Sequence, residues 1–281
     1  MVGRTLARFS ALGLLLGVGV LPTPLLAEAE HAVTLVVATP VRDSGLLAAI
    51  LPRFSVDTGI AVQVVAAEVG RALRLGEDGD ADVLLLSDLI AAGEFVAAGH
   101  GVLRREVMHS ELVIVGPASD PAQIRGLRDA VGALARIAQA RAPFVSRGDD
   151  GDVHRAERRL WKAVGFVVDA SVGTWYRETG TDMGTALNTA VELGAYTLCD
   201  RASWLGFRNK QALNLLVEGD RRLRQPFALV LVNPALRPSG REAAGRSLIR
   251  WLLSRDGQLA IRGYALDGEV PFLPSADDWA S

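Results

Sequence analysis

Short apolar runs alternate with amphipathic helical segments through the first third of the chain. The runs 33–38, 60–66 and 83–86 predict strands, and the segments that follow them predict helices. Parallel strands need a long right-handed crossover, and a helix between two strands supplies it. The alternation therefore predicts an α/β fold, with parallel-rich sheets flanked by helices on both faces.

Polar residues mark the expected helix starts in this region. Asp43 or Ser44 is expected to cap a helix that ends at Thr58, and Ser87 or Asp88 to cap a helix that runs to Ala98. A shorter helix is expected at 71–75.

The alternation resumes after a break. The apolar run 112–115 predicts a strand. Gly116, Pro117 and the pair Asp120–Pro121 follow this run and are strong signals of a turn or loop. We place a first domain crossing here and a second at the strand predicted beyond Pro226. The expected division is lobe I at 30–115 plus 227–281, and lobe II, inserted into it, at 116–226. Helices are expected at 126–140, after 150 through Val164, from about 183 to 193, at 240–253 and at 256–262.

The first 29 residues have the features of a secretion signal. Arg4 and Arg8 give a basic start, 11–21 is an apolar run, and Ala27 and Ala29 supply small residues for cleavage. We expect the mature protein to be periplasmic or otherwise extracytoplasmic. Cys199 is the single cysteine, which excludes an intramolecular disulfide, and we expect it to be a small core residue.

The composition excludes one broad class of partner. The 281 residues carry a formal charge of −2, whereas nucleic-acid-binding proteins usually show a strong basic excess. An apolar content of 49% is ordinary for a folded protein. We expect no nucleic-acid partner.

The stretch 143–154 has the layout of an anion site. An apolar strand stops at Ser146, Arg147 and Gly148, and a helix follows. The first amides of that helix lack intrahelical partners and lie at the positive end of its dipole, so they favour a negative ligand. Asp149, Asp150 and Asp152 place carboxylates in the same region.

Ligands of open α/β sheets bind beyond the carboxyl ends of the strands. Both lobes are therefore expected to turn such ends toward a shared cleft: 39–44 and 68–71 from one, 146–153 and 181–185 from the other. A secreted two-lobed chain of this kind is typical of a solute-binding protein that closes on its ligand by hinge motion.

The chain resembles the periplasmic tungstate-binding proteins of bacterial ABC transporters over nearly its whole mature length. The matching blocks are D-S-G-L-L at 43–47, L-G-E-D-G-D-A-D-V-L-L at 75–85, F-V-A-A-G-H-G at 95–101, V-I-V-G-P-A-S-D-P at 113–121, P-F-V-S-R-G-D-D at 143–150, W-Y-R-E-T-G at 175–180 and Y-T-L-C-D-R at 196–201. The resemblance implies a two-lobed fold of the type II periplasmic-binding class with a hinge of two crossings.

The resemblance also implies a ligand, tungstate or molybdate, and an ABC transporter permease as partner. The ligand-binding residues that it implies are Thr39, Gly70, Ser146, Arg147 and Gly184. We expect a monomer without a cofactor and without enzymatic activity.

Four cleft positions depart from the family pattern. Pro40 stands in a threonine-rich run, Glu68 in a small polar turn, Val153 in place of threonine, and Asp182 in a glycine-rich loop. These departures leave open a different small organic or zwitterionic solute, or a secreted sensory or interaction domain without a transport role.

Other interpretations of the same residues are weaker. Asp149, Asp150, Asp152 and His154 offer hard ligands for a metal ion, but acids in the first turn of a helix are favoured by its dipole alone, and we expect no metal. The mature chain has no G-x-S-x-G, H-E-x-x-H, C-x-x-C or P-loop motif of an enzyme. Trp175, Tyr176 and Trp204 are expected in the core rather than in the cleft.

Overall fold

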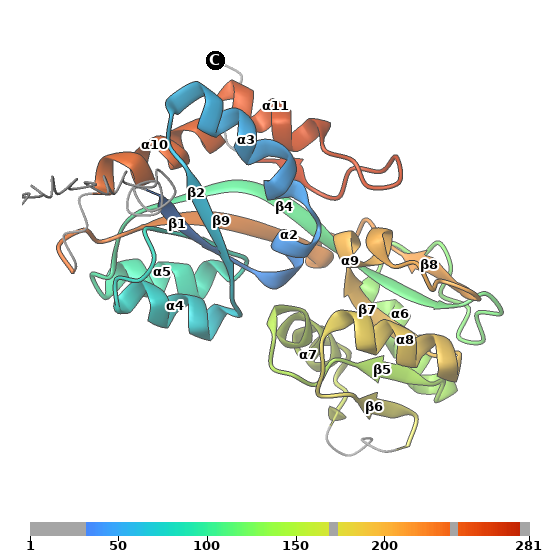
Figure 1. The fold of residues 1–281 in the computed structure, drawn as a ribbon. Helices are drawn as coiled ribbons and strands as arrows, with labels where there is room; N and C mark the ends of the chain where they lie inside the picture. The colour runs from blue at the N-terminus through green and yellow to red at the C-terminus, as the bar shows by residue number, and fades with distance from the viewer. Residues whose placement is uncertain (1–31, 169–173, 237–240, 276–281) are drawn as a thin grey trace, which may run out of the picture.

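The computed structural model describes residues 32–168, 174–236 and 241–275. The expected signal segment, 1–29, lies outside these residues. The described chain forms two lobes that lie side by side and are joined by two long strands, β4 and β9 (Figure 1).

The strands form one continuous mixed sheet in the order β2-β1-β3-β9-β4-β7-β5-β6, with β8 and β10 also paired to β4. Their bounds are β1 Val33–Val37, β2 Val62–Ala66, β3 Val83–Leu86, β4 Gly101–Pro117, β5 Phe144–Ser146, β6 Tyr176–Glu178, β7 Tyr196–Asp200, β8 Leu213–Val217, β9 Arg224–Val232 and β10 Leu273–Pro274. The same order occurs twice: β2-β1-β3-β9-β4 in lobe I is matched by β6-β5-β7-β4-β8 in lobe II. The fold class expected from the sequence is confirmed.

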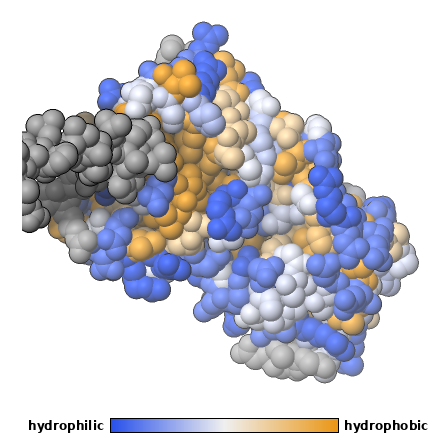
Figure 2. Space-filling model, viewed as in Figure 1, coloured by the Kyte–Doolittle hydropathy of each residue, from blue (hydrophilic) through white to orange (hydrophobic). Residues whose placement is uncertain are grey.

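Lobe I has helices on both faces of its sheet, because side chains along a strand alternate between faces. Val33, Leu35 and Val37 pack with α3, α10 and α11, whereas Val36 packs with α4 and α5. The helix bounds are α2 Thr39–Asp43, α3 Leu46–Thr58, α4 Val69–Glu77, α5 Leu89–Ala97, α10 Glu242–Leu253 and α11 Arg255–Gly263. Figure 2 shows hydrophobic residues mainly on the visible face of this lobe, with hydrophilic residues over much of lobe II.

Lobe II has its own hydrophobic core. Phe144 and Trp161, whose ring centroids are 5.2 Å apart, lie at its centre with Tyr176. Trp204 and Cys199 are buried here as well, which confirms that they are core residues. The helix bounds are α6 Ala130–Ala140, α7 Asp152–Val164, α8 Met183–Leu193, α9 Arg201–Gly206 and the short 3₁₀ helix η2 Arg221–Leu223.

The crossings between the lobes lie on β4 and at the start of β9. The β4 residues 101–111 pair with β9, whereas Leu112–Val115 pair with β7. We propose that the lobe boundaries are at 111/112 and near Arg224, a few residues before the boundaries that the sequence predicts. Because β4 runs without a break through both lobes, a hinge motion at this boundary would bend the sheet.

Some sequence-based expectations were wrong in detail. The sheet is parallel only toward its two ends, because β9 runs antiparallel between β3 and β4, and β4 runs antiparallel to β7. The strand expected at 112–115 is the end of the much longer β4. Helix α3 begins after Gly45 without a side-chain cap, whereas Asp88 caps α5 as expected, accepting from the amides of Ile90 and Ala91.

Candidate functional site

The carboxyl ends of the parallel strands from both lobes meet around a small cavity. Ala38 follows β1, Glu68 follows β2, Ser87 follows β3, Arg147 follows β5, and Asp200 ends β7. The remaining lining residues come from α2, from α7, from the crossing strands β4 and β9, and from the C-terminal segment just before β10: Pro40, Ser110, Asp152, Val153, Gln225, Phe227 and Phe272. The site thus lies where the topology of an open α/β sheet places a ligand, between the lobes.

Arg147 is the basic residue that lines this cavity. Its side chain is only 7% exposed, and its Nη2 forms an ion pair with Asp149. Its Nε has no hydrogen-bond partner among the described residues. A buried guanidinium with an unused N–H is costly unless a ligand accepts from it. This donor can bind the oxygen of an anion.

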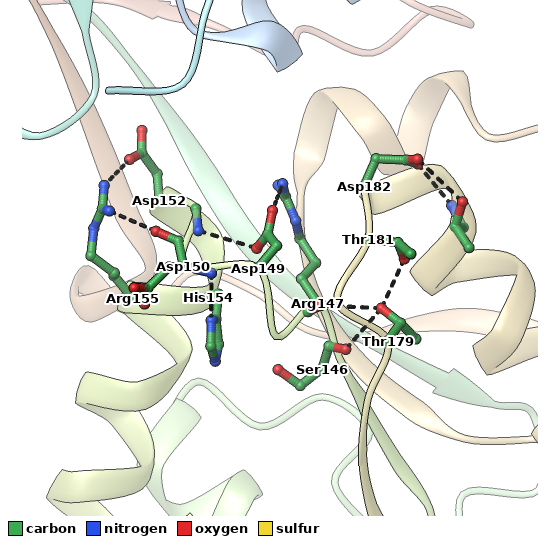
Figure 3. Close-up of polar contacts among 12 residues, drawn as sticks. Ser146, Arg147, Asp149, Asp150, Asp152, His154, Arg155, Thr179, Thr181 and Asp182 are labelled. Carbon is green, nitrogen blue, oxygen red and sulfur yellow. Dashed lines mark hydrogen bonds and ion pairs between the residues drawn. The ribbon is translucent and has the colours of Figure 1, made fainter. Parts of the chain in front are cut away.

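The loop after Arg147 is held in shape by its own polar groups (Figure 3). Gly148 has φ +63°, which favours glycine, and a Cβ there would lie 2.6 Å from Cβ of Glu178. Thr179 Oγ1 donates to the carbonyls of Ser146 and Arg147, at 3.2 Å each. The Asp150 amide donates to His154 Nδ1 at 3.0 Å. The position of Arg147 is therefore fixed before any ligand binds.

Asp152 joins the two lobes across the cavity. Its carboxylate accepts a hydrogen bond from Ser87 Oγ of lobe I and one from Arg155 Nη2 at 2.5 Å. Burial raises the pKa of Asp152 to about 6, against the opposing effect of Arg155. Its negative charge is therefore present only in part at mildly acidic pH.

Asp200 contributes a second buried carboxyl to the cavity. Its Oδ1 accepts from the amide of Ser203 at 2.8 Å and caps α9, while its Oδ2 has no partner among the described residues. Burial raises the pKa of this carboxyl. The cavity thus holds an unused donor, on Arg147, and an unused acidic oxygen, on Asp200.

A buried polar cluster supports the site from below. The Glu157 carboxylate accepts from Tyr176 Oη at 2.7 Å and from Trp161 Nε1 at 3.1 Å. Burial raises the pKa of Glu157 to about 7. Ser146 is fully buried near Glu157, with its hydroxyl outside hydrogen-bonding geometry.

The structure brings together some of the positions that the sequence singled out. Arg147 lines the cavity with three of the four departures from the family pattern, Pro40, Glu68 and Val153. Ser146 does not line it, because adjacent residues at the end of a strand point to opposite sides. Thr39, between two lining residues, is half-buried at the first position of α2.

The other predicted positions lie outside the cavity lining. Gly70 is exposed within α4, and Gly184 is exposed in the first turn of α8. Asp182 is exposed and caps α8 by accepting from the amide of Thr185 at 2.9 Å, and this hydrogen bond lowers its pKa. The extra acid at 182 thus has a structural role in the helix.

Sequence reasoning missed Ser87 and Asp200 as cavity residues. Both stand directly at the carboxyl end of a predicted strand, so the rule that placed Arg147 at the site applied to them equally. The sequence predicted Ser87 only as a possible helix cap and Asp200 only as the end of a strand. In the described part of the chain, no group of three His, Cys, Asp or Glu side chains is arranged to hold a metal ion. No helix within these residues is long and apolar enough to cross a membrane.

Comparisons with known proteins agree with this geometry. A model of the PBP superfamily domain matches residues 27–256. The tungstate-binding protein TupA of Peptoclostridium acidaminophilum is 38% identical over 253 residues, which are 89% of this chain and 87% of the relative.

Two solved structures are also similar. The tungstate-binding protein TupA from Desulfovibrio alaskensis G20 has a TM-score of 0.81 and 35% identity, covering 88% of this chain and 99% of its own. The tungstate ABC transporter structure from Geobacter sulfurreducens has a TM-score of 0.75 and 37% identity, covering 84% of this chain and 99% of its own. The chain belongs to the PBP superfamily and, within it, to the family of the tungstate-binding protein TupA.

Proposed function

We propose that the protein binds a small oxyanion, tungstate or molybdate, between its two lobes outside the cytoplasm and delivers it to the permease of an ABC importer. The observation that carries the proposal is the buried Arg147 guanidinium, whose Nε has no partner among the described residues and which lies in the cavity where strand ends from both lobes meet. The relatives named for tungstate binding support the choice of ligand.

The mechanism that we propose is capture by closure. The cavity has a volume of about 20 Å³. Since one water needs about 10–15 Å³, a tetrahedral oxyanion has no room in it. The lobes must part at the β4 and β9 crossings to admit the anion, and they then close around it to a cavity wider than this one when Arg147 pairs with it. The closed form would then dock on the permease. The protein acts by binding, as a monomer and without catalysis.

Glu68 favours a second candidate. Glu68 is exposed and lines the cavity, and its carboxylate has no hydrogen bond or ion pair within the described residues. A zwitterionic solute could place its anionic group on Arg147 and its ammonium on Glu68. The departure from a neutral turn at this position is the specific reason to test such solutes.

The test is a thermal-shift and calorimetric screen of residues 30–281 at pH 6.0 with tungstate, molybdate, sulfate, phosphate and small zwitterions. A true ligand at a hundred times its dissociation constant stabilises the protein by about 2.7 kcal/mol. We expect tungstate or molybdate to give the largest shift. A zwitterion that shifts the melting temperature while both oxyanions fail would replace the oxyanion proposal by the second candidate.

A further inference from the structure

Asp152 lies in the wall that separates the cavity from a second inter-lobe groove. That groove has a volume of about 290 Å³ and shares Ser87, Asp152 and Gln225 with the cavity. Four arginines line it: Arg155, Arg159, Arg222 and Arg224. An anion attracted by these arginines would reach Arg147 past the Asp152 carboxylate.

The carboxylate of Asp152 already has the contacts that a bound oxyanion would make. It accepts from a hydroxyl of one lobe and from a guanidinium of the other, and its side chain is 15% exposed. The protein thus carries an anion of its own where the two lobes meet.

We propose that Asp152 makes the site take up an anion together with one proton. The deprotonated carboxylate occupies part of the anion's place and repels it. The protonated carboxyl accommodates the anion, and its O–H can donate a hydrogen bond to an anion oxygen, which a carboxylate cannot do. A singly protonated oxyanion also satisfies this need for one proton, because its own O–H can donate a hydrogen bond to the Asp152 carboxylate. The inference rests on the proposed function and specifies the chemical class of its ligand.

The charges around Asp152 are consistent with proton uptake at this residue. The titratable and charged groups that face it, or line the two hollows with it, are Arg155 on the same helix, Glu68 before α4, Asp88 before α5, Arg147 and Asp149 after β5, Asp200 at the end of β7, and the groove arginines Arg159, Arg222 and Arg224. Burial raises the pKa of Asp152 most, and Glu68 and Asp88 raise it further against the opposing effects of Arg155 and Arg147, to about 6. The negative charge of a bound anion would raise this pKa again, through neutral pH.

The test is calorimetric titration of tungstate into residues 30–281 at pH 5.5, 6.5 and 7.5, in buffers of different ionisation enthalpy. For the wild type we expect uptake of close to one proton per anion at pH 7.5. We expect the association constant to fall about tenfold per pH unit well above the pKa of Asp152. This measurement uses the wild-type chain, so it does not depend on a variant folding.

The Asp152→Asn variant keeps an acceptor for Ser87 and Arg155 but cannot titrate. We expect it to bind tungstate without proton uptake, with an association constant that does not change above pH 6. At pH 7.5 it should bind about 30-fold more tightly than the wild type. The matched control is Asp88→Asn, which removes one charge beside Asp152 while keeping a side chain that can cap α5. In this control, the association constant for tungstate should fall with pH as it does in the wild type.

The outcomes separate the two proposals. Tungstate binding that does not change between pH 5.5 and 7.5, or an Asp152→Asn variant that keeps the slope, overturns the inference and leaves the oxyanion site standing. If another group, such as the buried His154, causes the pH dependence of tungstate binding, the Asp152→Asn variant will keep that dependence. Absence of tungstate binding by every variant at every pH overturns the proposed function and this inference with it.

Discussion

Two arginines stand at the same edge of the lobe II sheet, and their surroundings differ. Arg147 follows β5 and Arg201 follows β7, and these strands pair in parallel. Arg201 contacts three carboxylates, those of Glu111 at 2.7 Å, Glu218 at 2.5 Å and Glu269 at 3.6 Å. Within the described residues, the Arg147 guanidinium forms an ion pair with Asp149 alone and keeps an unused Nε.

The difference separates a structural arginine from a ligand-binding one. Arg201 ties the crossing strand β4 to the end of β8 and to the C-terminal segment, so its donors are used within the protein. Arg147 is more buried but has fewer partners. A cation that is buried and under-paired is a stronger indication of a site than burial or charge alone.

Replacing Arg147 should have the largest effect on binding. We expect Arg147→Ala to weaken oxyanion binding by about 100-fold or more, because each hydrogen bond to a charged group contributes about 1.5–3 kcal/mol. Calorimetry with tungstate at pH 6.0 measures the loss. The matched control, Arg201→Met, should bind within about threefold of the wild type. Equal losses in both variants would show that Arg147 has no special role in binding the anion.

The cluster beneath Arg147 should make stability depend on pH. The folded pKa of Glu157 is about 7, above the ordinary 4.5, so the folded state holds a proton that the unfolded state has lost. Stability from this group is full below pH 4.5 and falls as pH rises toward 7, by about 3 kcal/mol in total. Asp152, with a pKa of about 6, adds to the fall.

Glu157→Gln keeps an acceptor for Tyr176 and Trp161 but cannot lose a proton. Urea denaturation at pH 5 and pH 7.5 should show most of the fall in the wild type and little of it in this variant. A wild type that is equally stable at both pH values would show that Glu157 is ionised in the folded protein.

The structural arginine should matter for stability. Arg201→Met leaves one partly exposed and two mainly exposed carboxylates without their shared partner, and we expect a loss of about 1–3 kcal/mol in the free energy of unfolding. Arg147→Met should cost less, because it frees only Asp149. Urea titration of the two variants side by side compares these losses, and a larger loss in Arg147→Met would show that Arg201 is not the more important arginine for stability.

The smallest expected effect is at the turn that positions Arg147. Gly148→Ala places a side chain at φ +63° and against Glu178, and we expect a loss of about 1 kcal/mol in stability with weaker tungstate binding. Gly165→Ala is the control, since it has φ +79° at the end of α7 with nothing within 4 Å of the new Cβ. It should lose similar stability without weakening binding.

The sequence predicted the buried elements best. The strand 83–86 and the helix 183–193 have the predicted bounds, because their apolar residues face a core throughout or at helical spacing. The first half of β4 was missed, because Arg104, Arg105 and Glu106 break the apolar pattern on a strand that is largely exposed there.

The site was predicted only in part, for geometric reasons. Arg147 follows from its place after a strand, but Ser146 beside it points into the lobe because successive side chains alternate. The contact between Ser87 and Asp152 joins residues 65 positions apart and depends on how the lobes meet, which no local pattern contains.

The most direct test of the oxyanion site is a crystal structure of residues 30–281 grown with tungstate, with the tungsten located by its anomalous scattering. We expect one strong peak in the inter-lobe cavity, with an oxygen of the anion within hydrogen-bonding distance of Arg147 Nε. A strong peak elsewhere, for example in the arginine-lined groove beyond Asp152, with the Arg147 cavity empty, would contradict this expectation.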